Sequence, residues 1–336
     1  MRKIELVRFG VDGLQPVDAP AVAPQAGQVA VRMHAASLNY HDLATALGFA
    51  NPRMALPQVP LSDGAGEVIA VGEGVTALQV GDRVCSLFFP DWQAGPPSIP
   101  VLRRVTGETA PGVLQDVMVA SADAFIRIPE HLGFIEAATL PCAALTAWRA
   151  VVVEGQVKAG DRVLIQGTGG VSLFALQFAR LLGAETWVIS SSDDKLARAK
   201  ALGADHLLNY RQEAGWGRAI RKQSGDGVDL VVEVGGSGTL AQSLDAVRLG
   251  GHISMIGVLT GVASQVSTAK IMAMNVTLRG ITVGNRQQFA EMNRAIALHR
   301  LQPVIGEVFG FAQLPRALQT LQAAGHVGKL CFDFSR

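Results

Sequence analysis

The sequence is poor in cysteine, has no excess of one charge and lacks any long hydrophobic run. Its 336 residues include only three cysteines, at positions 85, 142 and 331, so a framework of disulfide bonds is excluded. Lysine and arginine together number 29, against 28 for aspartate and glutamate, which leaves a net charge of +1. Proteins that bind nucleic acid usually carry a basic excess, so we expect no nucleic-acid partner.

The distribution of apolar residues also excludes a membrane partner. No stretch of about 18 apolar residues free of charge occurs, which is the length that a spanning helix needs. Residues 1–10, MRKIELVRFG, carry charges within an apolar pattern and lack the hydrophobic core of a signal peptide. We therefore expect a cytoplasmic protein.

The residues present in plenty are apolar ones, at 49%, and glycine, at 37 residues. A chain of this length suggests about two domains, and its pattern changes along the sequence. In the first part, short β-branched runs such as 28–35 and 83–89 alternate with turns of Gly, Pro and Asp, which is typical of a small barrel or sandwich. Further on, expected strands such as 162–166 and 228–234 alternate with helices such as 171–182, which indicates βαβ units on a parallel sheet. We therefore predict the mixed α/β class.

A glycine-rich turn at 167–172 lies between the expected strand 162–166 and the expected helix 171–182, the context in which a G-x-G-x-x-G pattern binds a dinucleotide. Its first glycine permits the tight turn, and its second lets the backbone approach a pyrophosphate at the N-terminus of the helix. Serine replaces the third glycine and is small enough for packing of the helix on the strand. An ordinary glycine-rich turn is the alternative, but the flanking pattern favours cofactor binding. The residues expected to bind the cofactor are Gly167, Thr168, Gly169, Gly170 and Val171.

The end of the next expected strand indicates which dinucleotide binds. Proteins that bind NAD place an acidic residue there to hold the ribose 2′-hydroxyl. Here that position falls in the run Ser190, Ser191, Ser192, and Lys195 follows. Hydroxyl groups with a cation suit a 2′-phosphate, so we expect NADPH rather than NADH, held by Ser190, Ser191 and Lys195. Arg198 also follows, and we interpret it as part of a solvated helix face.

Several short segments, spread in order over nearly the whole chain, together carry a family resemblance. They are ASLNYHD at 36–42, DGAGEV at 63–68, VGEGV at 71–75, VGDRV at 80–84, ATLPC at 138–142, LTAW at 145–148 and GAD at 203–205. The chain resembles the medium-chain dehydrogenase/reductase superfamily, most of all its zinc-independent, quinone-oxidoreductase-like branch and close alcohol-dehydrogenase-like relatives. The resemblance implies a GroES-like, β-rich catalytic domain at 1–124 and 284–336, and a Rossmann domain with a doubly wound parallel sheet at 125–283. It also implies a homodimer or homotetramer.

The resemblance implies further contacts with the cofactor. The residues concerned are Asp42, Thr146, Tyr210, Gly235, Gly257, Val258, Val283, Gly284 and Asn285. For each of them a turn or core position is the competing interpretation. The same holds for Lys329, which the resemblance brings near the site.

The resemblance also bears on metal binding. Zinc-bearing members carry a cysteine where this chain has Asn39 and a histidine where it has Ser62, and their third ligand matches Cys142. One thiolate with an amide and a hydroxyl is a poor zinc site, because zinc takes about four ligands from Cys, His and carboxylates. Residues 90–111 contain no cysteine, so the four-cysteine structural lobe is absent as well. We expect no metal.

Without a metal, hydrogen-bond donors must polarise the hydride acceptor, because its oxygen gains negative charge during the transfer. The candidates are Asn39, Tyr40 and His41. His41 has a side chain that can deliver a proton near neutral pH, although a solvent-facing loop position is equally compatible with the sequence. An apolar substrate pocket is one expected role of Phe88, Phe89 and Trp92. The alternative is that these residues anchor a loop.

The sequence thus predicts a zinc-independent, NADPH-dependent oxidoreductase that transfers hydride to a small apolar quinone or α,β-unsaturated carbonyl compound. One alternative is a zinc-free NAD(P)-dependent alcohol dehydrogenase or aldehyde reductase. A second is a catalytically weak NADPH-binding protein with a regulatory or structural role.

Overall fold

Two compact units make up the computed structural model, which describes all residues from 1 to 336. The first unit contains residues 1–145 and 284–336, and the second contains 146–283. The first division lies later than the expected one after residue 124. Residues 125–145 belong with the first unit because β7 pairs with β5 there and because the backbone N–H of Cys142 donates to Asp63.

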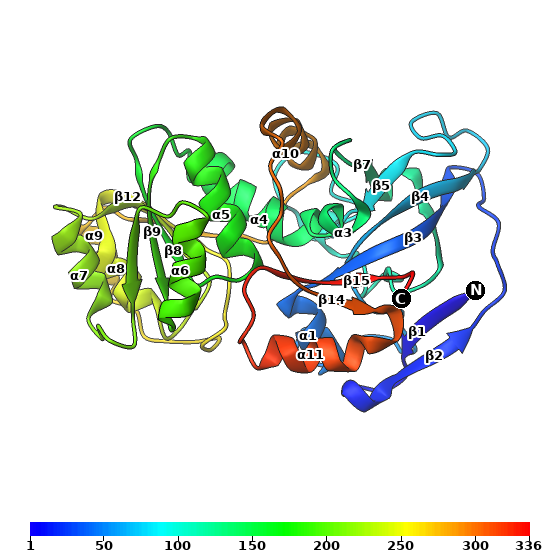
Figure 1. Ribbon diagram of the computed structural model, residues 1–336, viewed down its shortest axis with the longest axis horizontal. Helices are drawn as coiled ribbons and strands as arrows, with labels where there is room; N and C mark the ends of the chain where they lie inside the picture. The colour runs from blue at the N-terminus through cyan, green and yellow to red at the C-terminus, as the bar shows by residue number, and fades with distance from the viewer. The chain divides into compact units, whose positions relative to one another are not determined.

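A seven-stranded sheet forms the centre of the first unit, in the order β14-β15-β3-β4-β5-β7, with β6 also paired to β3 (Figure 1). A separate two-stranded sheet contains β1 and β2. The strands are β1 (Arg2–Leu6), β2 (Leu14–Asp18), β3 (Gln28–Leu38), β4 (Asp63–Val71), β5 (Arg83–Ser86), β6 (Val117–Ser121), β7 (Phe125–Arg127), β14 (Ile305–Gly310) and β15 (Lys329–Asp333). The helices are α1 (Tyr40–Ala46), α2 (Ile99–Leu102), α3 (Phe134–Ala137), α10 (Arg286–His299) and α11 (Leu314–Gln322).

The longest strand, β3, organises this unit. Its apolar residues Val29, Val31 and Met33 are buried in one core, to which the returning C-terminal segment contributes Phe332. Strand β15 pairs antiparallel with β3, with Leu330 opposite Leu38. This pairing brings the start of β15 beside the end of β3, two points that lie about 290 residues apart in the sequence.

The second unit contains a six-stranded parallel sheet in the order β10-β9-β8-β11-β12-β13. The strands are β8 (Arg162–Gln166), β9 (Glu185–Ser190), β10 (His206–Asn209), β11 (Val228–Glu233), β12 (Val247–Met255) and β13 (Thr277–Gly280). The helices are α4 (Leu145–Trp148), which begins at the last residue of the first unit, α5 (Gly170–Leu181), α6 (Asp193–Ala201), α7 (Trp216–Gln223), α8 (Leu240–Ala246) and α9 (Thr268–Ala273).

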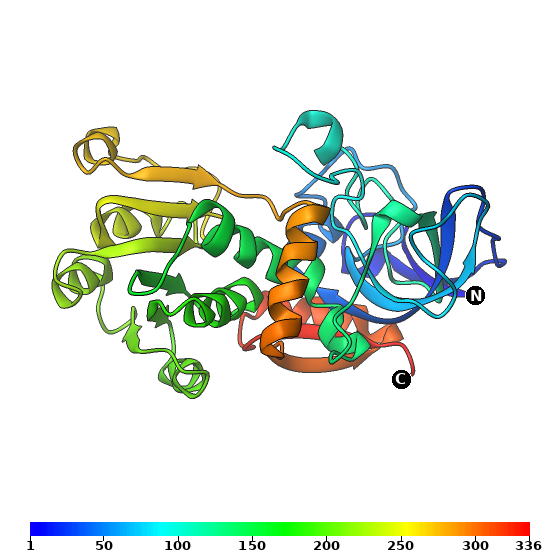
Figure 2. The same ribbon diagram turned by 90° about the horizontal axis from the view of Figure 1, so that it is seen from above.

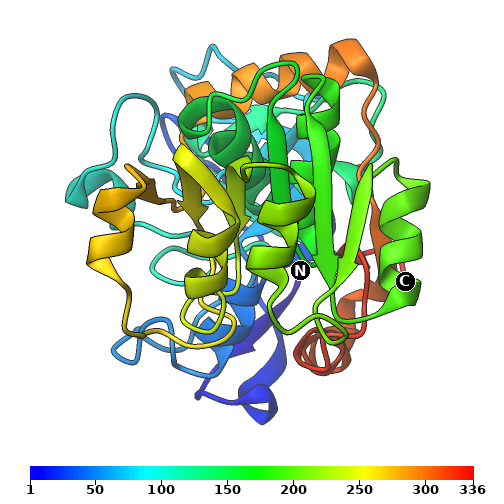
Figure 3. The same cartoon turned by 90° about the vertical axis from the view of Figure 1, so that its left-hand side faces the viewer.

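The strand order doubles back at β8, so right-handed connections place α5 and α6 on one face of the sheet and α7 and α8 on the other (Figure 3). Both faces are covered, which explains why β8 is an unbroken apolar run whose residues Val163, Leu164 and Ile165 are fully buried. Strand β13 forms one edge of the sheet (Figure 2). The predicted α/β class, with a GroES-like domain and a doubly wound parallel sheet, is confirmed.

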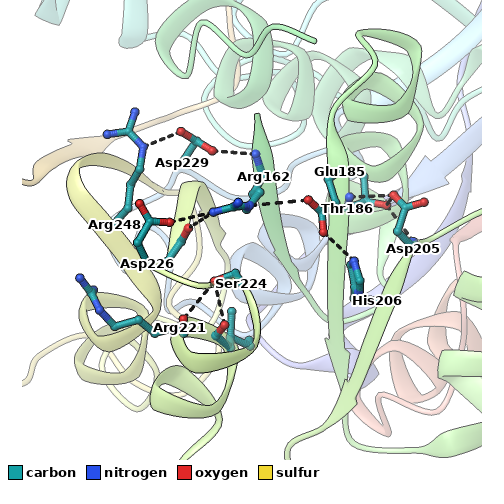
Figure 4. Close-up of polar contacts among 12 residues, drawn as sticks. Arg162, Glu185, Thr186, Asp205, His206, Arg221, Ser224, Asp226, Asp229 and Arg248 are labelled. Atoms are coloured by element: carbon teal, nitrogen blue, oxygen red, sulfur yellow. Dashed lines mark hydrogen bonds and ion pairs between the residues drawn. The ribbon is translucent and has the colours of Figure 1, made fainter. Parts of the chain in front are cut away.

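The amino ends of the parallel strands carry a charge network (Figure 4). The Arg162 guanidinium donates to Asp226 over 2.7 Å, and its backbone N–H donates to Asp229 over 2.7 Å. Nearby, the His206 ring lies 2.6 Å from a Glu185 carboxylate oxygen. This end of the sheet is therefore tied together by polar contacts, which leaves the carboxyl ends for ligands. Among all the helices, none has the length and apolar content needed to cross a bilayer.

Candidate functional site

The carboxyl ends of the strands gather most of the expected cofactor residues of the second unit at one edge of the sheet. Gly167 follows β8, Ser191 follows β9, Tyr210 follows β10, Gly235 lies beyond β11, and Gly257 lies beyond β12. Because carboxyl ends of parallel strands meet at the same edge, residues from five separate segments face one region. Thr146 is not among them: it is a buried residue of α4, before the first of these strands.

The glycine-rich turn has the geometry that a pyrophosphate needs. Gly167 has a φ of 75°, which glycine adopts without strain. Gly169 is the N-cap of α5, no side chain caps this helix, and a Cβ at Gly169 would have no atom within 4 Å. The first N–H groups of α5 are therefore unpaired beside open space, and a dinucleotide phosphate fits there. The Ser172 hydroxyl donates to the Gln166 carbonyl over 2.6 Å, which explains the serine at the third glycine position.

Two cations lie close together near the end of β9. Burial lowers the pKa of Lys195, and the nearby charge of Arg211 lowers it further. Arg211 was not predicted from the sequence. Its position directly after Tyr210, an expected cofactor residue, could have indicated it. Tyr210 itself is 41% exposed. Ser190 is buried, and its carbonyl accepts from the Tyr210 backbone N–H over 3.1 Å. The hydroxyl that remains at the surface here is therefore that of Ser191 rather than that of Ser190.

A buried carboxylate shapes the turn after β11. Glu233 is fully buried, and five groups donate to its two oxygens. The donors are the backbone N–H groups of Gly235 and Gly236, the hydroxyls of Thr239 and Ser243, and the amide of Gln166. The role of Glu233 was not predicted from the sequence, in which it looks like an ordinary strand residue. Its carboxylate fixes the backbone of Gly235 at the edge of the sheet.

Packing, rather than closeness to a ligand, requires the glycines at two of the expected positions. A Cβ at Gly235 would lie 2.2 Å from the Thr239 hydroxyl, and one at Gly257 would lie 2.1 Å from the Val234 carbonyl. Val258 is 49% exposed at the same edge. Packing therefore gives a structural reason for both glycines, and their contact with a cofactor stays a prediction.

In the first unit, a polar cluster begins at the N-terminus of α1. Asn39 is the N-cap of this helix, and its backbone N–H donates to Asp42 over 2.7 Å. The other Asp42 oxygen accepts from the Ser62 backbone N–H over 3.0 Å. Both oxygens of this buried carboxylate thus hold the local backbone, which gives Asp42 a structural role as a helix cap.

The cluster continues as a chain of hydrogen bonds between residues far apart in the sequence. The Asn39 amide nitrogen donates to the Ser62 hydroxyl over 3.2 Å, and that hydroxyl donates to Asp63 over 2.8 Å. The second Asp63 oxygen accepts from the Cys142 backbone N–H over 2.9 Å. At the other end, Lys329 Nζ donates to Asn39 Oδ1 over 2.5 Å and to the Leu38 carbonyl over 2.6 Å. Asn39, Ser62, Asp63 and Lys329 are all buried.

Burial dominates the electrostatics of the cluster. It raises the pKa of Asp63 to about 6, against the opposing charge of Lys329 and the hydrogen bonds from Asn39 and Ser62. Burial also raises the pKa of Asp42, although the charges of His41 and Lys329 oppose this. The two carboxylates and the ammonium therefore form one coupled group of charges.

A second ionisable pair lies beside the cluster. His41 Nε2 lies 3.0 Å from a Glu108 carboxylate oxygen, and the edge of the imidazole contacts Phe88, with ring centroids 5.1 Å apart. Burial lowers the pKa of His41, but the hydrogen bond to Glu108 and the charges of Asp42 and Glu108 outweigh it, so that the net pKa is raised. The pairing of Glu108 with His41 was not predicted from the sequence, because Glu108 lies in an irregular loop. Tyr40 is the exposed residue of this region, at 48%.

Asn285 and its neighbours also have structural roles. The Asn285 side chain caps α10 by accepting from the Gln288 backbone N–H over 2.8 Å, and its amide donates to the Gly95 carbonyl over 3.1 Å. A Cβ at Gly284 would lie 2.9 Å from the Leu145 side chain. Both polar groups of the Asn285 side chain are thus engaged within its own unit, where the side chain acts as a helix cap. Val283 is buried and has a φ of 34°.

Comparison with known sequences now identifies the family. Residues 25–130 match the family described as alcohol dehydrogenase GroES-like domain, and residues 170–298 match the family described as zinc-binding dehydrogenase. A zinc-type alcohol dehydrogenase-like protein of Schizosaccharomyces pombe is 42% identical over 334 residues, covering 96% of this chain and 95% of that protein. The chain belongs to the medium-chain dehydrogenase/reductase superfamily.

Two further members of the superfamily are similar along nearly their whole length. A quinone oxidoreductase of Rattus norvegicus is 27% identical, covering 98% of this chain and 97% of that protein. A mycobacterial protein whose structure was solved in complex with NADPH is 28% identical, with a TM-score of 0.83 and 99% of each chain covered. This medium-chain dehydrogenase/reductase is therefore an oxidoreductase that uses a nicotinamide cofactor, NADH or NADPH.

The residues of this dehydrogenase/reductase do not fit the zinc ion that the family description names. The positions of the expected ligands hold an amide, Asn39, and a hydroxyl, Ser62, each already hydrogen-bonded within the unit. An ammonium group, that of Lys329, contacts the first of them directly. No group of three or more His, Cys, Asp and Glu side chains has the arrangement of a metal site. An amide, a hydroxyl and a lysine are not the ligands that zinc takes in proteins.

Proposed function

We propose that this chain is a zinc-independent, NADPH-dependent reductase of quinones or α,β-unsaturated carbonyl compounds. The observation that carries the proposal is the buried chain Lys329–Asn39–Ser62–Asp63, which supplies hydrogen-bond donors and a positive charge where a metal-dependent relative needs ligands. Similarity to a quinone oxidoreductase over nearly the whole chain supports the class of acceptor.

The preference for NADPH rests on charge at the end of β9. A 2′-phosphate adds about two negative charges, and the adjacent Lys195 and Arg211 supply two positive ones. The partly buried Ser191 adds a hydroxyl donor beside them. The pairing of Asp193 with Asn209 and Gln212 supports the same preference, because this carboxylate already has partners. Similarity to a protein solved with NADPH agrees with it.

The bound cofactor supplies a hydride to the substrate. Residues of the first unit stabilise the developing charge and deliver the proton. As negative charge develops on the substrate oxygen, the Asn39 N–H that lies toward Asp63 donates to this oxygen instead, and the Lys329 charge stabilises it. His41, held by Glu108, then delivers the proton from the nitrogen that Glu108 does not engage. Phe88 and its aromatic neighbours exclude water from the side of the imidazole that they cover.

A second candidate is a zinc-free alcohol dehydrogenase or aldehyde reductase. The His41–Glu108 pair favours it, since interconversion of an alcohol and a carbonyl compound requires a proton acceptor and donor at the same oxygen. Similarity to a zinc-type alcohol dehydrogenase-like protein agrees with this candidate.

A panel of acceptors separates the two candidates. Quinones, enones and aldehydes are offered with NADPH or NADH, alcohols are offered with NADP⁺ or NAD⁺, and absorbance of the reduced cofactor is followed. The proposal predicts the highest kcat/KM with a quinone or an enone and with NADPH. Preference for aldehydes and alcohols selects the second candidate. Tight binding of NADPH without any turnover contradicts both and favours a binding protein.

A pair of variants tests the cofactor preference. Arg211→Ala should weaken NADPH binding about 10- to 100-fold, the loss expected for one charge-assisted contact with a phosphate, and leave NADH binding unchanged. Arg198→Ala, also an exposed arginine on this side of the unit, is the matched control and should change neither. Equal losses for NADPH and NADH in Arg211→Ala would contradict the 2′-phosphate assignment.

A further inference from the structure

The buried lysine of the first unit is unusual for a residue at the start of a β-strand. Lys329 is 4% exposed, and its ammonium makes two hydrogen bonds, to the Leu38 carbonyl and to Asn39 Oδ1. An ammonium has three donors, so one N–H remains for a further partner. Burial of a charge is costly unless the charge is paired, and the charges of Asp42 and Asp63 act on this group.

The contacts of Lys329 place it at the end of one continuous network. Its ammonium reaches Asn39, the Asn39 amide reaches Ser62, and Ser62 reaches Asp63. Asp63 in turn holds the backbone of Cys142. Asn39, Ser62 and Cys142 are the positions at which the resemblance places the ligands of a metal ion. Lys329 is therefore a cation in direct contact with the first of these positions.

The ammonium also decides the orientation of the Asn39 amide. A lysine ammonium donates and cannot accept, so the group of Asn39 that faces it must be the oxygen. The amide nitrogen is thereby directed away from Lys329, with one N–H on the Ser62 hydroxyl and the other toward the Asp63 carboxylate, the side from which it would donate to a substrate. Without Lys329 the amide could turn over and present an acceptor where a donor is required.

We propose that the Lys329 ammonium is a built-in cation at the centre of this polar cluster, occupying the place of a metal ion and fixing the Asn39 amide with its nitrogen as the donor. The first part of this proposal, that the ammonium excludes a metal ion, does not depend on which reaction the protein catalyses. The second part, in which Asn39 donates to the substrate oxygen, rests on the proposed function, and Lys329 acts there as a positioning residue.

Metal binding by designed variants tests the first part without any measurement of activity. Asn39→Cys with Ser62→His restores the thiolate and imidazole that zinc-bearing members carry, beside Cys142. Co²⁺ is titrated into this double variant and into the same variant with Lys329→Met, and the visible absorption of thiolate-bound Co²⁺ is followed. We expect at least about tenfold tighter binding without the lysine, because a buried ammonium repels a divalent cation at the same point. Equal affinities, or binding in neither variant, would overturn the proposal.

Steady-state kinetics of the single variant test the second part, and they remain informative if the triple variant does not fold. Lys329→Met should lower kcat about 100-fold, the loss typical of a misplaced donor to a developing oxyanion, with little change in KM for NADPH. Propylammonium added to Lys329→Ala should restore part of kcat. A loss confined to KM for NADPH, or no restoration, would overturn the positioning role. If the wild-type protein reduces no acceptor, the proposed function fails, while the Co²⁺ titration still decides the exclusion of a metal.

Discussion

The two units differ in how their candidate functional residues are brought together. In the second unit, the turn at 167–172 is a local feature: its glycines, the strand before it and the helix after it are consecutive in the sequence. In the first unit, Asn39, Ser62, Asp63 and Lys329 meet only because β15 returns to pair with β3. Local sites are set by backbone conformation and tolerate change in side chains, whereas a network assembled from distant segments depends on each side chain.

The sharpest test of this difference is a change that affects ligand binding without affecting the fold. Gly169→Val places methyl groups in the open space beside the N-terminus of α5, where a pyrophosphate would lie. We expect NADPH affinity to fall at least about 100-fold, which is about 2.7 kcal/mol, as measured by fluorescence titration. The melting temperature should change by no more than a few degrees, the shift that about 1 kcal/mol produces.

The matched control for this change is Gly325→Val. Gly325 also has open space around its Cβ position, but it lies in the first unit and outside the site. It should change neither affinity nor stability. Unchanged NADPH binding in Gly169→Val would remove the turn from the cofactor site.

The polar network of the first unit should make the stability of the protein depend on pH. Asp63 has a folded-state pKa of about 6, above the usual value of about 3.9 in an unfolded chain, so the folded state binds the extra proton between these pH values. Ionisation of Asp63 therefore lowers stability as the pH rises through this window. Asp63→Asn removes this contribution. Between about pH 4.5 and pH 7, the unfolding free energy of the variant relative to wild type should rise by about 1–3 kcal/mol.

Denaturant titrations at both pH values measure this change, whatever constant offset the substitution adds. Asp123→Asn, an exposed aspartate in the same unit, should show no such dependence on pH. A difference between variant and wild type that stays constant with pH, or falls, would contradict the buried state of Asp63.

The His41–Glu108 pair should respond more weakly. Glu108→Gln removes the partner that raises the pKa of His41, so the imidazole pKa should fall, as followed by NMR titration of the ring protons. Since the folded pKa of His41 is raised, its stabilising contribution is present below about pH 6.5 and is lost as the pH rises through the folded value. The Glu108 pKa is lowered by His41, so its contribution is lost as the pH falls below about 4.3.

The pair is thus most stabilising between these two limits, and Glu108→Gln should cost most there. Glu73→Gln, an exposed carboxylate elsewhere in the unit, is the control and should leave the His41 titration unchanged. An unaltered His41 pKa in Glu108→Gln would show that Glu108 does not stabilise the protonated imidazole.

The smallest effect is expected at the amino ends of the parallel strands, away from the cofactor edge. Asp229 accepts from the Arg162 backbone N–H over 2.7 Å and from the Arg248 guanidinium. Asp229→Asn should lower stability by about 1 kcal/mol, because the group is partly exposed and screened, and it should leave NADPH affinity unchanged. Asp226→Asn, whose carboxylate is largely exposed, should cost less in the same denaturation experiment. A loss of cofactor affinity in either variant would contradict the separation of the two ends of the sheet.

The fold and the glycine-rich turn could be predicted from the sequence because both depend on local patterns. Period, glycine position and the alternation of strands with helices are all visible within a few tens of residues. Lys329 could not be recognised in the same way, since its partner Asn39 is brought beside it only by strand pairing. Glu108 lies in an irregular loop, where no period indicates what a side chain faces. For Asp42 and Asn285, resemblance indicates that a residue is near a site, but not that its side chain caps a helix.

Metal content and turnover, measured on one sample of the wild-type protein, decide whether this enzyme works without zinc. Zinc is determined by elemental analysis before and after treatment with a chelator, and oxidation of NADPH by a quinone or an enone is followed in the same fractions. We expect turnover that is unchanged by the chelator and unrelated to zinc content. Activity that disappears with zinc and returns in proportion to zinc added back would contradict this expectation.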